Sequence, residues 1–457
     1  MIIKIPNNNI KEREYILDVI FKEFLGLDFS LVIDFNQGLD WVIELENKNK
    51  LIFEDYFFNK FLTEKEYLDE KNIPLRIGYF KEEKKEFLAE KDLPVIFGMP
   101  KIKINNLKDV KEIYCSIDVF ASSFFMLSRW EEYVNKKRDL HNRFPSCESV
   151  AFKNNFLDRP VVNEYVFFIH SLISSLDFSQ KIKKREYKML VTHDVDAPLR
   201  YTSWKSGLVE IVRDISVRKS PVLACKNVFL KLKSILKISK DPYDTFDFLM
   251  KLSDKHGLKS FFFFMAKGNT HFDNRYSLDN PKIKALIDRI KQKGHFIGIH
   301  PTYNSYNDVN QFTKEKNELQ KASDKTCVNF GRQHFLRFEA PITWQIWEDN
   351  NMKWDSTLSY ADREGFRCGV CYEFPVFNFL TRKELNLYEK PLIVMEGSFA
   401  TYQKHISKQE MIDRIVNLQK KVRKYNGSFV ILWHNSSFNT PFWNKYKGVY
   451  EHIIGLK

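Results

Sequence analysis

Carboxylate side chains stand at the end of an apolar run in the second half of the chain. The run closes with Thr192-His193-Asp194-Val195-Asp196. Because side chains alternate along a strand, Asp194 and Asp196 are expected on one face and His193 on the other. Two carboxylates on one face suit a division of work, in which one ligates a cation and the other moves a proton. The alternative is that both acids cap the segment that follows.

Histidines flank the next such run. A strand predicted over 296–299 is preceded by His295 and followed by His300, and Pro301 favours an extended backbone at His300. His295 and His300 fall on opposite faces of this strand, so at most one of them readily joins the two aspartates. Taken alone, these two histidines are as well explained by a structural role as by a functional one.

An arginine and two further histidines complete the polar residues at predicted strand ends. Arg332 and His334 are expected to share one face of a strand, and His434 follows the apolar run 429–433. An arginine beside acids can hold a carboxylate through paired hydrogen bonds. Acids, imidazoles and a guanidinium at successive strand ends therefore predict a metal-assisted site.

The elements that must position these residues begin near residue 187. Apolar, strand-like runs alternate there with amphipathic helical segments, of which 281–293 and 408–424 are examples. Strand, helix and strand repeated in this way imply a parallel sheet, and functional residues collect at the carboxyl ends of such strands. The predicted strands are 189–191, 261–265, 296–299, 353–357, 392–395 and 429–433.

The first part of the chain gathers no titratable residues in an obvious site. We expect a small α/β accessory domain over 1–110, followed by a helical connecting segment over 111–186. The parallel α/β domain then covers 187–457. Within the accessory domain the predicted elements are a helix at 10–24 and strands at 31–33, 41–43 and 94–97.

The strand-end residues also resemble the motifs of a known enzyme family, the NodB-type polysaccharide deacetylases of carbohydrate esterase family 4. T-H-D-V-D at 192–196 resembles the family motif T-F-D-D-G, and G-H-F-I-G-I-H-P-T-Y-N at 294–304 resembles G-H-E-I-G-x-H-T-x-x-H. R-Q-H-F at 332–335 is similar to R-x-P-Y, and L-W-H at 432–434 matches L-x-H. The resemblance covers 187–457 and implies a distorted (β/α)7 barrel.

A second resemblance concerns residues 118–160. They are similar to the N-terminal extension of a divergent bacterial subgroup of these proteins, which often accompanies genes for surface glycan synthesis. The resemblance therefore implies a role in bacterial surface polysaccharide synthesis.

The resemblance implies a metal triad of one Asp and two His. Asp196 and His300 match two of these ligands, but Asn304 occupies the place of the second histidine. His334 stands where the family has a proline, and it would supply the missing imidazole. The alternatives are a site with Asn304 or His193 as a weaker ligand, with His295 as a further alternate, and a fold without a functional metal.

The implied reaction is the removal of an acetyl group from an amino sugar in a glycan or glycan precursor. Asp194 would act as the general base, His434 as the general acid, and Arg332 would hold Asp194 ionised and oriented. Zinc is the expected divalent metal, and Co²⁺, Fe²⁺ and Ni²⁺ also suit the ligands. The residues expected to bind the acetylated sugar or glycan substrate are Trp433, Tyr303 and Arg337. The alternative function is a catalytically degraded protein of the same fold that binds or assembles glycans, and Asn304 supports it.

Composition limits the other partners. Lys and Arg exceed Asp and Glu by 13 in 457 residues, and hydrophobic residues make up 44%, which excludes disordered and low-complexity classes. Lys is spread along the chain, often beside Glu, so no nucleic-acid partner is expected. The exception is the basic amphipathic stretch 222–240. A peripheral contact with anionic membrane lipid is a hypothesis for this stretch, and a helix packed on the barrel is its alternative.

The remaining features concern the compartment. Six cysteines in a chain of this length do not form a disulfide framework, and the N-terminus lacks the pattern of a signal peptide. No run of 18 apolar residues is present. These features predict a cytoplasmic protein, with the inner face of the membrane as the alternative location.

Overall fold

The fold is described in a computed structural model of the chain. The structure describes residues 1–35, 40–82, 86–106, 110–201, 240–273, 276–324, 326–403 and 405–456. Between 201 and 240 it describes only residues 222, 225, 228, 229, 231 and 232. The basic stretch 222–240 therefore falls largely outside the described residues. No helix in the described ranges is both long and apolar enough to cross a membrane.

The N-terminal half contains a mixed six-stranded sheet. Its spatial order is β2-β1-β3-β4-β8-β7. The strands are β1 (Ile2–Pro6), β2 (Ser30–Asp34), β3 (Trp41–Glu44), β4 (Lys50–Phe53), β7 (Gly98–Asn106) and β8 (Lys111–Ile117). β8 pairs with both β4 and β7, so this sheet continues past residue 110, where the accessory domain is predicted to end.

A short antiparallel pair lies beside this sheet. It consists of β5 (Gly78–Phe80) and β6 (Leu93–Val95). The strand predicted at 94–97 corresponds in part to β6.

Helices pack against the N-terminal sheet. α1 (Ile10–Leu17) continues as a π-helix over Asp18–Leu25, in agreement with the predicted helix. The segment 111–186, predicted to be helical, includes α2 (Val119–Ser128) and α3 (Trp130–Val134). The break falls at Arg129, whose φ of 56° is left-handed. Two further helices, α4 (Val150–Lys153) and α5 (Val161–Leu176), follow.

The C-terminal half is built on a nine-stranded sheet, which confirms the predicted α/β class. Its order is β14-β15-β13-β12-β11-β10-β9-β17-β16, and all neighbours are parallel except β14 and β15. The strands are β9 (Lys188–Val195), β10 (Ser260–Phe264), β11 (Phe296–Ile299), β12 (Phe330–Gly331), β13 (Trp354–Asp355), β14 (Phe374–Asn378), β15 (Lys383–Glu389), β16 (Val394–Met395) and β17 (Ser428–Leu432). Because the order runs from β14 to β16, closure into a (β/α)7 barrel stays a prediction.

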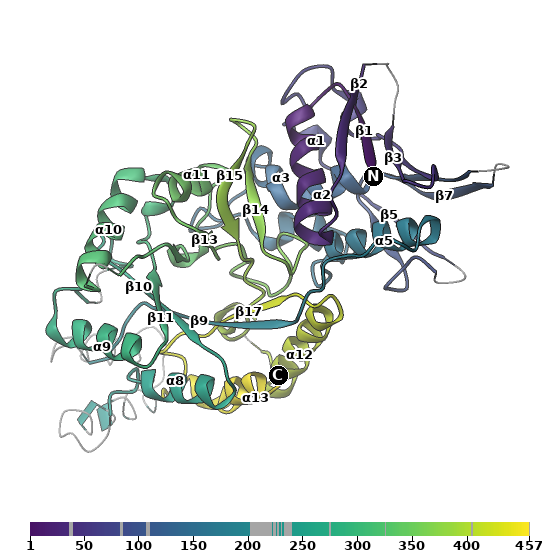
Figure 1. The fold of residues 1–457 in the computed structure, drawn as a ribbon. Coiled ribbons are helices and arrows are strands. Elements are labelled where there is room, and N and C mark those ends of the chain that lie inside the picture. The colour runs from purple at the N-terminus through teal and green to yellow at the C-terminus, as the bar shows by residue number, and fades with distance from the viewer. Residues whose placement is uncertain are drawn as a thin grey trace.

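Helices surround this second sheet in Figure 1. They are α8 (Phe246–Lys255), α9 (Pro281–Gln292), α10 (Val309–Ala322), α11 (Ile342–Asp349), α12 (Lys408–Lys424) and α13 (Val449–Gly455). α9 illustrates how the sequence specifies them. Its side chains at positions 283, 286, 287 and 290 are buried with helical spacing, and Asn280 accepts a hydrogen bond from the Lys282 N–H at its start.

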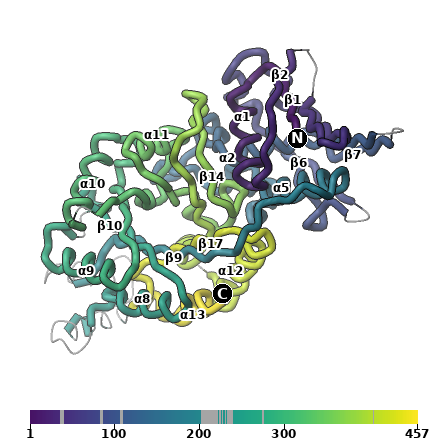
Figure 2. Tube along the Cα trace, in the orientation of Figure 1, coloured from purple at the N-terminus to yellow at the C-terminus, as the bar shows by residue number. Residues whose placement is uncertain are grey.

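The two halves of the chain contact each other closely. Figure 2 shows α1 and α2 running beside β14. The Tyr15 hydroxyl donates to the Pro375 carbonyl at 2.8 Å, and the Phe124 and Phe377 rings lie 5.6 Å apart. One hydrophobic core includes buried residues of both halves. The N-terminal region is therefore packed against the sheet that carries the candidate site.

Candidate active site

The polar residues predicted at strand ends gather at the carboxyl edge of the parallel sheet. Asp194 lies near the end of β9, and Asp196 follows that strand. His300 follows β11, and His434 lies two residues after β17. Because β9, β10 and β11 are parallel neighbours, their carboxyl ends meet at one edge.

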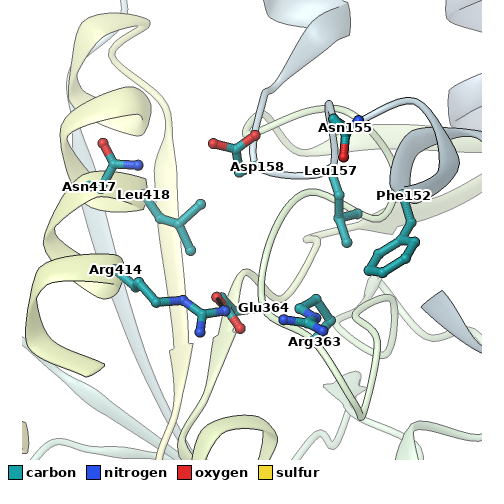
Figure 3. A pocket seen from close by; sticks show the side chains of 9 residues that line it. All are labelled: Phe152, Asn155, Leu157, Asp158, Arg363, Glu364, Arg414, Asn417 and Leu418. Carbon is teal, nitrogen blue, oxygen red and sulfur yellow. Dashed lines mark hydrogen bonds and ion pairs between the residues drawn. The ribbon is translucent and has the colours of Figure 1, made fainter. Parts of the chain in front are cut away.

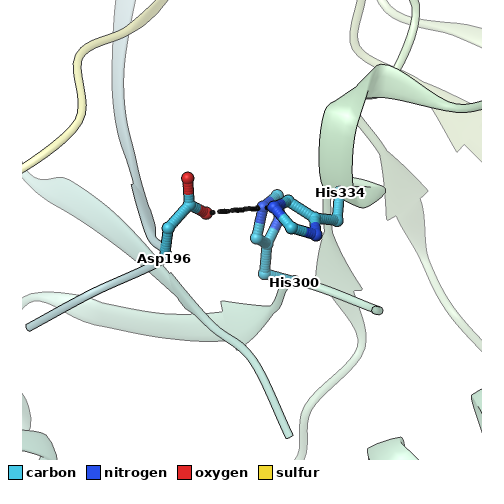
Figure 4. Close-up of side chains that lie close together, drawn as sticks. All are labelled: Asp196, His300 and His334. Carbon is cyan, nitrogen blue, oxygen red and sulfur yellow. Dashed lines mark ion pairs between the residues drawn. The ribbon is translucent and has the colours of Figure 1, made fainter. Parts of the chain in front are cut away.

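Three side chains form a cluster suited to a cation (Figure 4). Asp196, His300 and His334 each offer a ligand atom, and these atoms lie within 4.8 Å of one another. The Asp196 Oδ1 atom is 3.2 Å from His300 Nε2 and 3.7 Å from His334 Nε2. Both imidazoles are buried, whereas the Asp196 side chain is 37% exposed, so solvent reaches the cluster from the aspartate side.

The outer nitrogen of each imidazole is fixed by a hydrogen bond. His300 Nδ1 donates to the Arg332 carbonyl at 2.7 Å, and His334 Nδ1 donates to Asp273 Oδ1 at 3.1 Å. The same Asp273 oxygen accepts a hydrogen bond from the Tyr303 N–H at 2.8 Å. With Nδ1 protonated, the lone pair of a neutral imidazole lies on Nε2, which faces Asp196 in both cases.

The electrostatics of the cluster favour an ionised Asp196. Burial raises the pKa of Asp196, but the three neighbouring imidazoles of His300, His334 and His434 outweigh it and hold this pKa well below its usual range. Burial lowers the pKa of His334, whereas Asp194 and Asp196 outweigh burial and raise the pKa of His300, so a cation bound here would displace a proton from His300. Asp196 Oδ1 is buried and has no hydrogen-bond partner. One carboxylate and two imidazoles leave a coordination position for a small molecule, as in catalytic zinc sites.

Asp194 is held from behind by a buried arginine. Arg332 Nη1 donates to Asp194 Oδ1 at 2.9 Å and to Thr192 Oγ1 at 2.9 Å. Another edge of the guanidinium contacts Ser356, where Arg332 Nε donates to the Ser356 carbonyl at 2.8 Å. Asp194 Oδ2 lies 3.8 Å from His300 Nδ1, so this carboxylate adjoins the cluster without belonging to it.

The expectation that Arg332 and His334 share a strand face is wrong. β12 ends at Gly331, and His334 begins a 3₁₀ turn over His334–Leu336. The two side chains still reach the same site, because the backbone turns between them. Strand periodicity could not predict this arrangement.

His434 is the fourth polar group at the site, and a glutamate holds it. His434 Nδ1 lies 2.7 Å from Glu396 Oε1, and the His434 N–H donates to the same oxygen at 3.1 Å. His434 Nε2 is 3.7 Å from Asp196 Oδ2. Burial lowers the pKa of His434, but Glu396 and then the two aspartates outweigh it and raise this pKa to about 10.

Sequence reasoning missed two of these partners. Glu396 directly follows β16, so the strand-end rule that identified the other residues could have found it. Asp273 lies in the loop after β10, nine residues beyond Phe264, and no spacing pattern marks it.

The alternate ligands lie away from the cluster. His193 points to the opposite face, where Nδ1 donates to the Trp433 carbonyl at 2.7 Å. His295 Nδ1 accepts from the Ser260 N–H at 3.0 Å, at the other end of the strands. Asn304 is exposed, and its Oδ1 accepts a hydrogen bond from Arg337 at 3.3 Å.

The residues expected to bind substrate do not line the cavity at this cluster. Trp433 is 1% exposed and faces a separate cavity beside α13. Arg337 is buried between the rings of Tyr303 and Tyr306, at 3.9 and 4.0 Å from their centres. Tyr303 lies in the shell around the site, through its N–H bond to Asp273. These placements give Arg337 and Tyr303 supporting contacts, and they leave Trp433 in the core.

A cavity of about 180 Å³ opens over the cluster. Besides the five Asp and His residues above, it is lined by Arg143, Phe335, Leu336, Met395, Gly397, Tyr402 and Leu432. Arg143 comes from the N-terminal half of the chain, so both halves contribute to this cavity.

A second, larger cavity of about 430 Å³ lies between residues 152–158 and α12 (Figure 3). Among its lining residues, Arg414 pairs with Glu364, and Asp158 pairs with Lys421. Its charged groups are thus largely engaged with protein partners.

Parts of the chain resemble known proteins. The profile of a family of unknown function (DUF7033) matches residues 1–177. No curated protein matches the chain significantly. One similar structure is a candidate polysaccharide deacetylase from Mycobacterium smegmatis, with 12% identity and a TM-score of 0.37 over 60% of this chain and 84% of that one. Another is the catalytic domain of peptidoglycan N-acetylglucosamine deacetylase from Eubacterium rectale ATCC 33656, with 14% identity and a TM-score of 0.29 over the same shares of the two chains.

Proposed function

We propose that this chain is a metal-dependent hydrolase that removes an acetyl group from an amino sugar in a glycan or glycan precursor. One observation carries the proposal. The Asp196, His300 and His334 cluster adjoins two separately supported groups, Asp194 on Arg332 and His434 on Glu396. A site with cation ligands, a base and an acid around one cavity suits hydrolysis of an amide or ester.

Asp196, His300 and His334 would hold the cation. When bound, it supplies a Lewis acid that polarises the acyl carbonyl and lowers the pKa of water. Zinc is the first candidate, and Co²⁺, Fe²⁺ and Ni²⁺ also accept one carboxylate with imidazoles. The hydrogen bonds from His300 to the Arg332 carbonyl and from His334 to Asp273 orient the two imidazoles for this role.

Asp194 is the proposed general base. The Arg332 guanidinium donates to Oδ1 and fixes the plane of the carboxylate. Oδ2 is left to accept a proton from the attacking water inside the cavity, which Asp194 lines. A positioned base of this kind typically contributes 10²–10⁴-fold to the rate.

His434 is the proposed general acid. Its Nδ1 is engaged by Glu396, so the proton on Nε2 is available to the departing amine of the sugar. Nε2 lies 3.7 Å from Asp196 Oδ2, whereas the other two imidazoles face Asp196 Oδ1. Proton uptake and proton release are thus assigned to different groups, Asp194 and His434.

The size of the cavity indicates which part of the substrate enters it. About 180 Å³ corresponds to roughly six water molecules, at about 30 Å³ each. An acetamido group with its attacking water fits this space. The resemblance of residues 118–160 to the N-terminal extension of one bacterial subgroup supports a place for this reaction in bacterial surface polysaccharide synthesis.

The alternative function is a glycan-binding or assembly protein without catalysis. Its sequence support was Asn304 in place of a histidine. His334 stands beside Asp196 instead and supplies an imidazole, so the geometry favours the enzyme.

Metal content tests the proposal directly. Protein purified without chelator is expected to contain close to one divalent metal per chain, and His300→Ala is expected to contain far less. Wild-type protein that contains no bound metal under these conditions, and takes up none from added zinc, would contradict the proposed hydrolase. Acetate release from N-acetylated hexosamine oligosaccharides then measures the activity of the metal-loaded protein.

A further inference from the structure

A loop of the N-terminal half reaches the turn that carries His334. Arg143 is buried and donates from Nη1 to the Phe335 carbonyl at 3.1 Å. Its Nη2 donates to the Tyr402 hydroxyl at 2.9 Å, and its Nε donates to Asp139 at 2.8 Å. The guanidinium thus connects the 139–143 loop to two segments that line the active-site cavity.

The turn contacted by Arg143 has an unusual backbone. Phe335 and Leu336 are consecutive residues with φ values of 60° and 55°. Residues other than glycine rarely adopt this left-handed region, because their Cβ atom crowds the neighbouring backbone there. Such conformations persist where the surroundings hold them. His334 directly precedes these two residues, so the position of its imidazole depends on what holds the turn.

Other contacts of the loop reach residues around His334. His141 Nδ1 lies 3.1 Å from the Tyr303 hydroxyl, and the His141 ring lies 4.7 Å from the Phe335 ring. Arg337, just after the turn, donates from Nε to the His141 carbonyl at 2.9 Å. The Tyr303 N–H in turn donates to Asp273, which accepts the hydrogen bond from His334 Nδ1. The loop therefore braces both the backbone of His334 and the carboxylate that orients its ring.

We infer that the 139–143 loop completes the candidate metal centre, with Arg143 as the positioning residue that holds His334 toward Asp196. The inference rests on the proposed function, because the effect expected from Arg143 is on the affinity of the site for metal. It gives a role to a region that matches a family of unknown function, because the loop lies inside residues 1–177. In this arrangement the N-terminal region is part of the active site and not a separate accessory module.

The test compares three variants with the full-length wild-type chain. Arg143→Ala removes all three contacts. Arg143→Lys keeps the charge near Asp139 but lacks the planar fork that reaches the Phe335 carbonyl and the Tyr402 hydroxyl together. Arg138→Ala is the matched control, because Arg138 lies in the same segment and donates to the carbonyls of residues 132, 135 and 137.

Hydrogen–deuterium exchange of the metal-free proteins is measured first, over peptides that cover residues 330–338. Exchange is expected to rise in both Arg143 variants and to stay at the wild-type level in Arg138→Ala. Zinc affinity is then measured by competition with a chromophoric chelator. The zinc dissociation constant is expected to rise 10- to 100-fold in Arg143→Ala, as for other partners that orient metal ligands, and less in Arg143→Lys. The visible absorption of the Co²⁺-loaded proteins reports whether the ligand geometry changes.

The outcomes separate this inference from the proposed function. Unchanged exchange over residues 330–338 in the Arg143 variants overturns the inference, whether or not zinc binds. A zinc affinity within twofold of wild type in both variants also overturns it. If exchange rises but the wild-type chain binds no zinc, the proposed function fails, while the support of the turn by Arg143 stands. Should Arg143→Ala not fold, the same comparisons apply to Arg143→Lys.

Discussion

At the scale of single residues, each imidazole of the site has one nitrogen fixed and the other directed inward. His300, His334 and His434 bind the Arg332 carbonyl, Asp273 and Glu396 through Nδ1. All three Nε2 atoms lie within 3.7 Å of an Asp196 oxygen. Their partners are a backbone carbonyl at His300 and carboxylates at His334 and His434. Glu396 outweighs burial and raises the pKa of His434 to about 10, which suits an acid, whereas burial lowers the pKa of His334, which suits a neutral ligand.

Asp194→Asn separates the base from the metal ligands. The amide oxygen can still accept the hydrogen bond from Arg332, so the fold and the Asp196 cluster should persist. Because an amide cannot take up the proton of water, acetate release is expected to fall about 10²–10⁴-fold. Metal content, measured on the same preparation, should remain at the wild-type level. Wild-type activity in this variant would exclude Asp194 as the base.

His434→Ala tests the acid by changing the leaving group. Hydrolysis of an N-acetyl amide is expected to fall about 10²–10⁴-fold, because the departing amine needs a proton. Hydrolysis of p-nitrophenyl acetate should fall much less, since nitrophenolate leaves without one. His452→Ala, an exposed histidine of α13, serves as the control. Equal losses on both substrates would contradict the role of His434 as the acid.

At the scale of elements, the short strand β12 sets the position of two site residues. It pairs with β11 through Ile299 and Gly331, and Arg332 follows at once. A Cβ atom at residue 331 would lie 1.9 Å from the Ile299 carbonyl oxygen, which is a backbone atom that cannot rotate away. A side chain at this position therefore has to displace β12 from β11.

Gly331→Ala is expected to lower the free energy of unfolding by about 1–3 kcal/mol and to weaken zinc binding, because the displaced strand moves Arg332 and His334. Chemical denaturation and chelator competition measure the two effects. Gly78→Ala in β5 is the matched control, since its Cβ would meet side-chain atoms at an ordinary 3.6 Å. Equal stability and zinc affinity in the two variants would argue against this role of β12.

At the scale of the whole molecule, a buried ion cluster joins the two halves of the chain. Glu132, from α3, accepts hydrogen bonds from Arg129 Nε at 2.9 Å and from Arg367 Nε at 2.9 Å. All three side chains are buried.

Glu132→Gln leaves two buried guanidinium groups without this carboxylate, so it should destabilise the chain by about 3–5 kcal/mol at pH 7. Glu148→Gln, which removes an exposed ion pair with Lys153, should cost at most about 1 kcal/mol. Denaturant unfolding measures both changes. Equal decreases in the free energy of unfolding in the two variants would show that the buried cluster stabilises the chain no more than an exposed ion pair does.

The same cluster predicts a dependence on pH. Burial raises the pKa of Glu132, but Arg367 and Arg129 outweigh it and lower this pKa from 4.5 to about 2. A carboxyl group with a lowered pKa stabilises the folded state above the unfolded-state pKa, and this contribution is lost as the pH falls. The stability difference between wild type and Glu132→Gln should therefore shrink by about 3 kcal/mol between pH 5 and pH 2. Denaturant unfolding at several pH values measures it, and a constant difference would contradict the assignment.

Much of the architecture around the site could be predicted from the sequence. Buried parallel strands read as continuous apolar runs, and amphipathic helices such as α9 and α12 repeat with helical spacing. The predicted strands correspond to β9, β10, β11 and β17, and to parts of β13 and β16. The β14–β15 hairpin and strand β8 were not predicted. β15 joins its sheet by pairing with β13, and β8 pairs with the distant β4, and local periodicity contains no signal for either pairing.

The sequence by itself determined which chemical groups stand at the strand ends. Asp194, Asp196, His300 and His434 follow apolar strands, and parallel pairing brings such ends to one edge for a general physical reason. Only the tertiary structure placed His334 beside Asp196 and left Asn304 exposed, because both lie in irregular turns. It alone also brought Asp273 and Arg143 to the site. These two residues reach it through long-range packing between segments, and the order of residues along the chain carries no periodic signal for that packing.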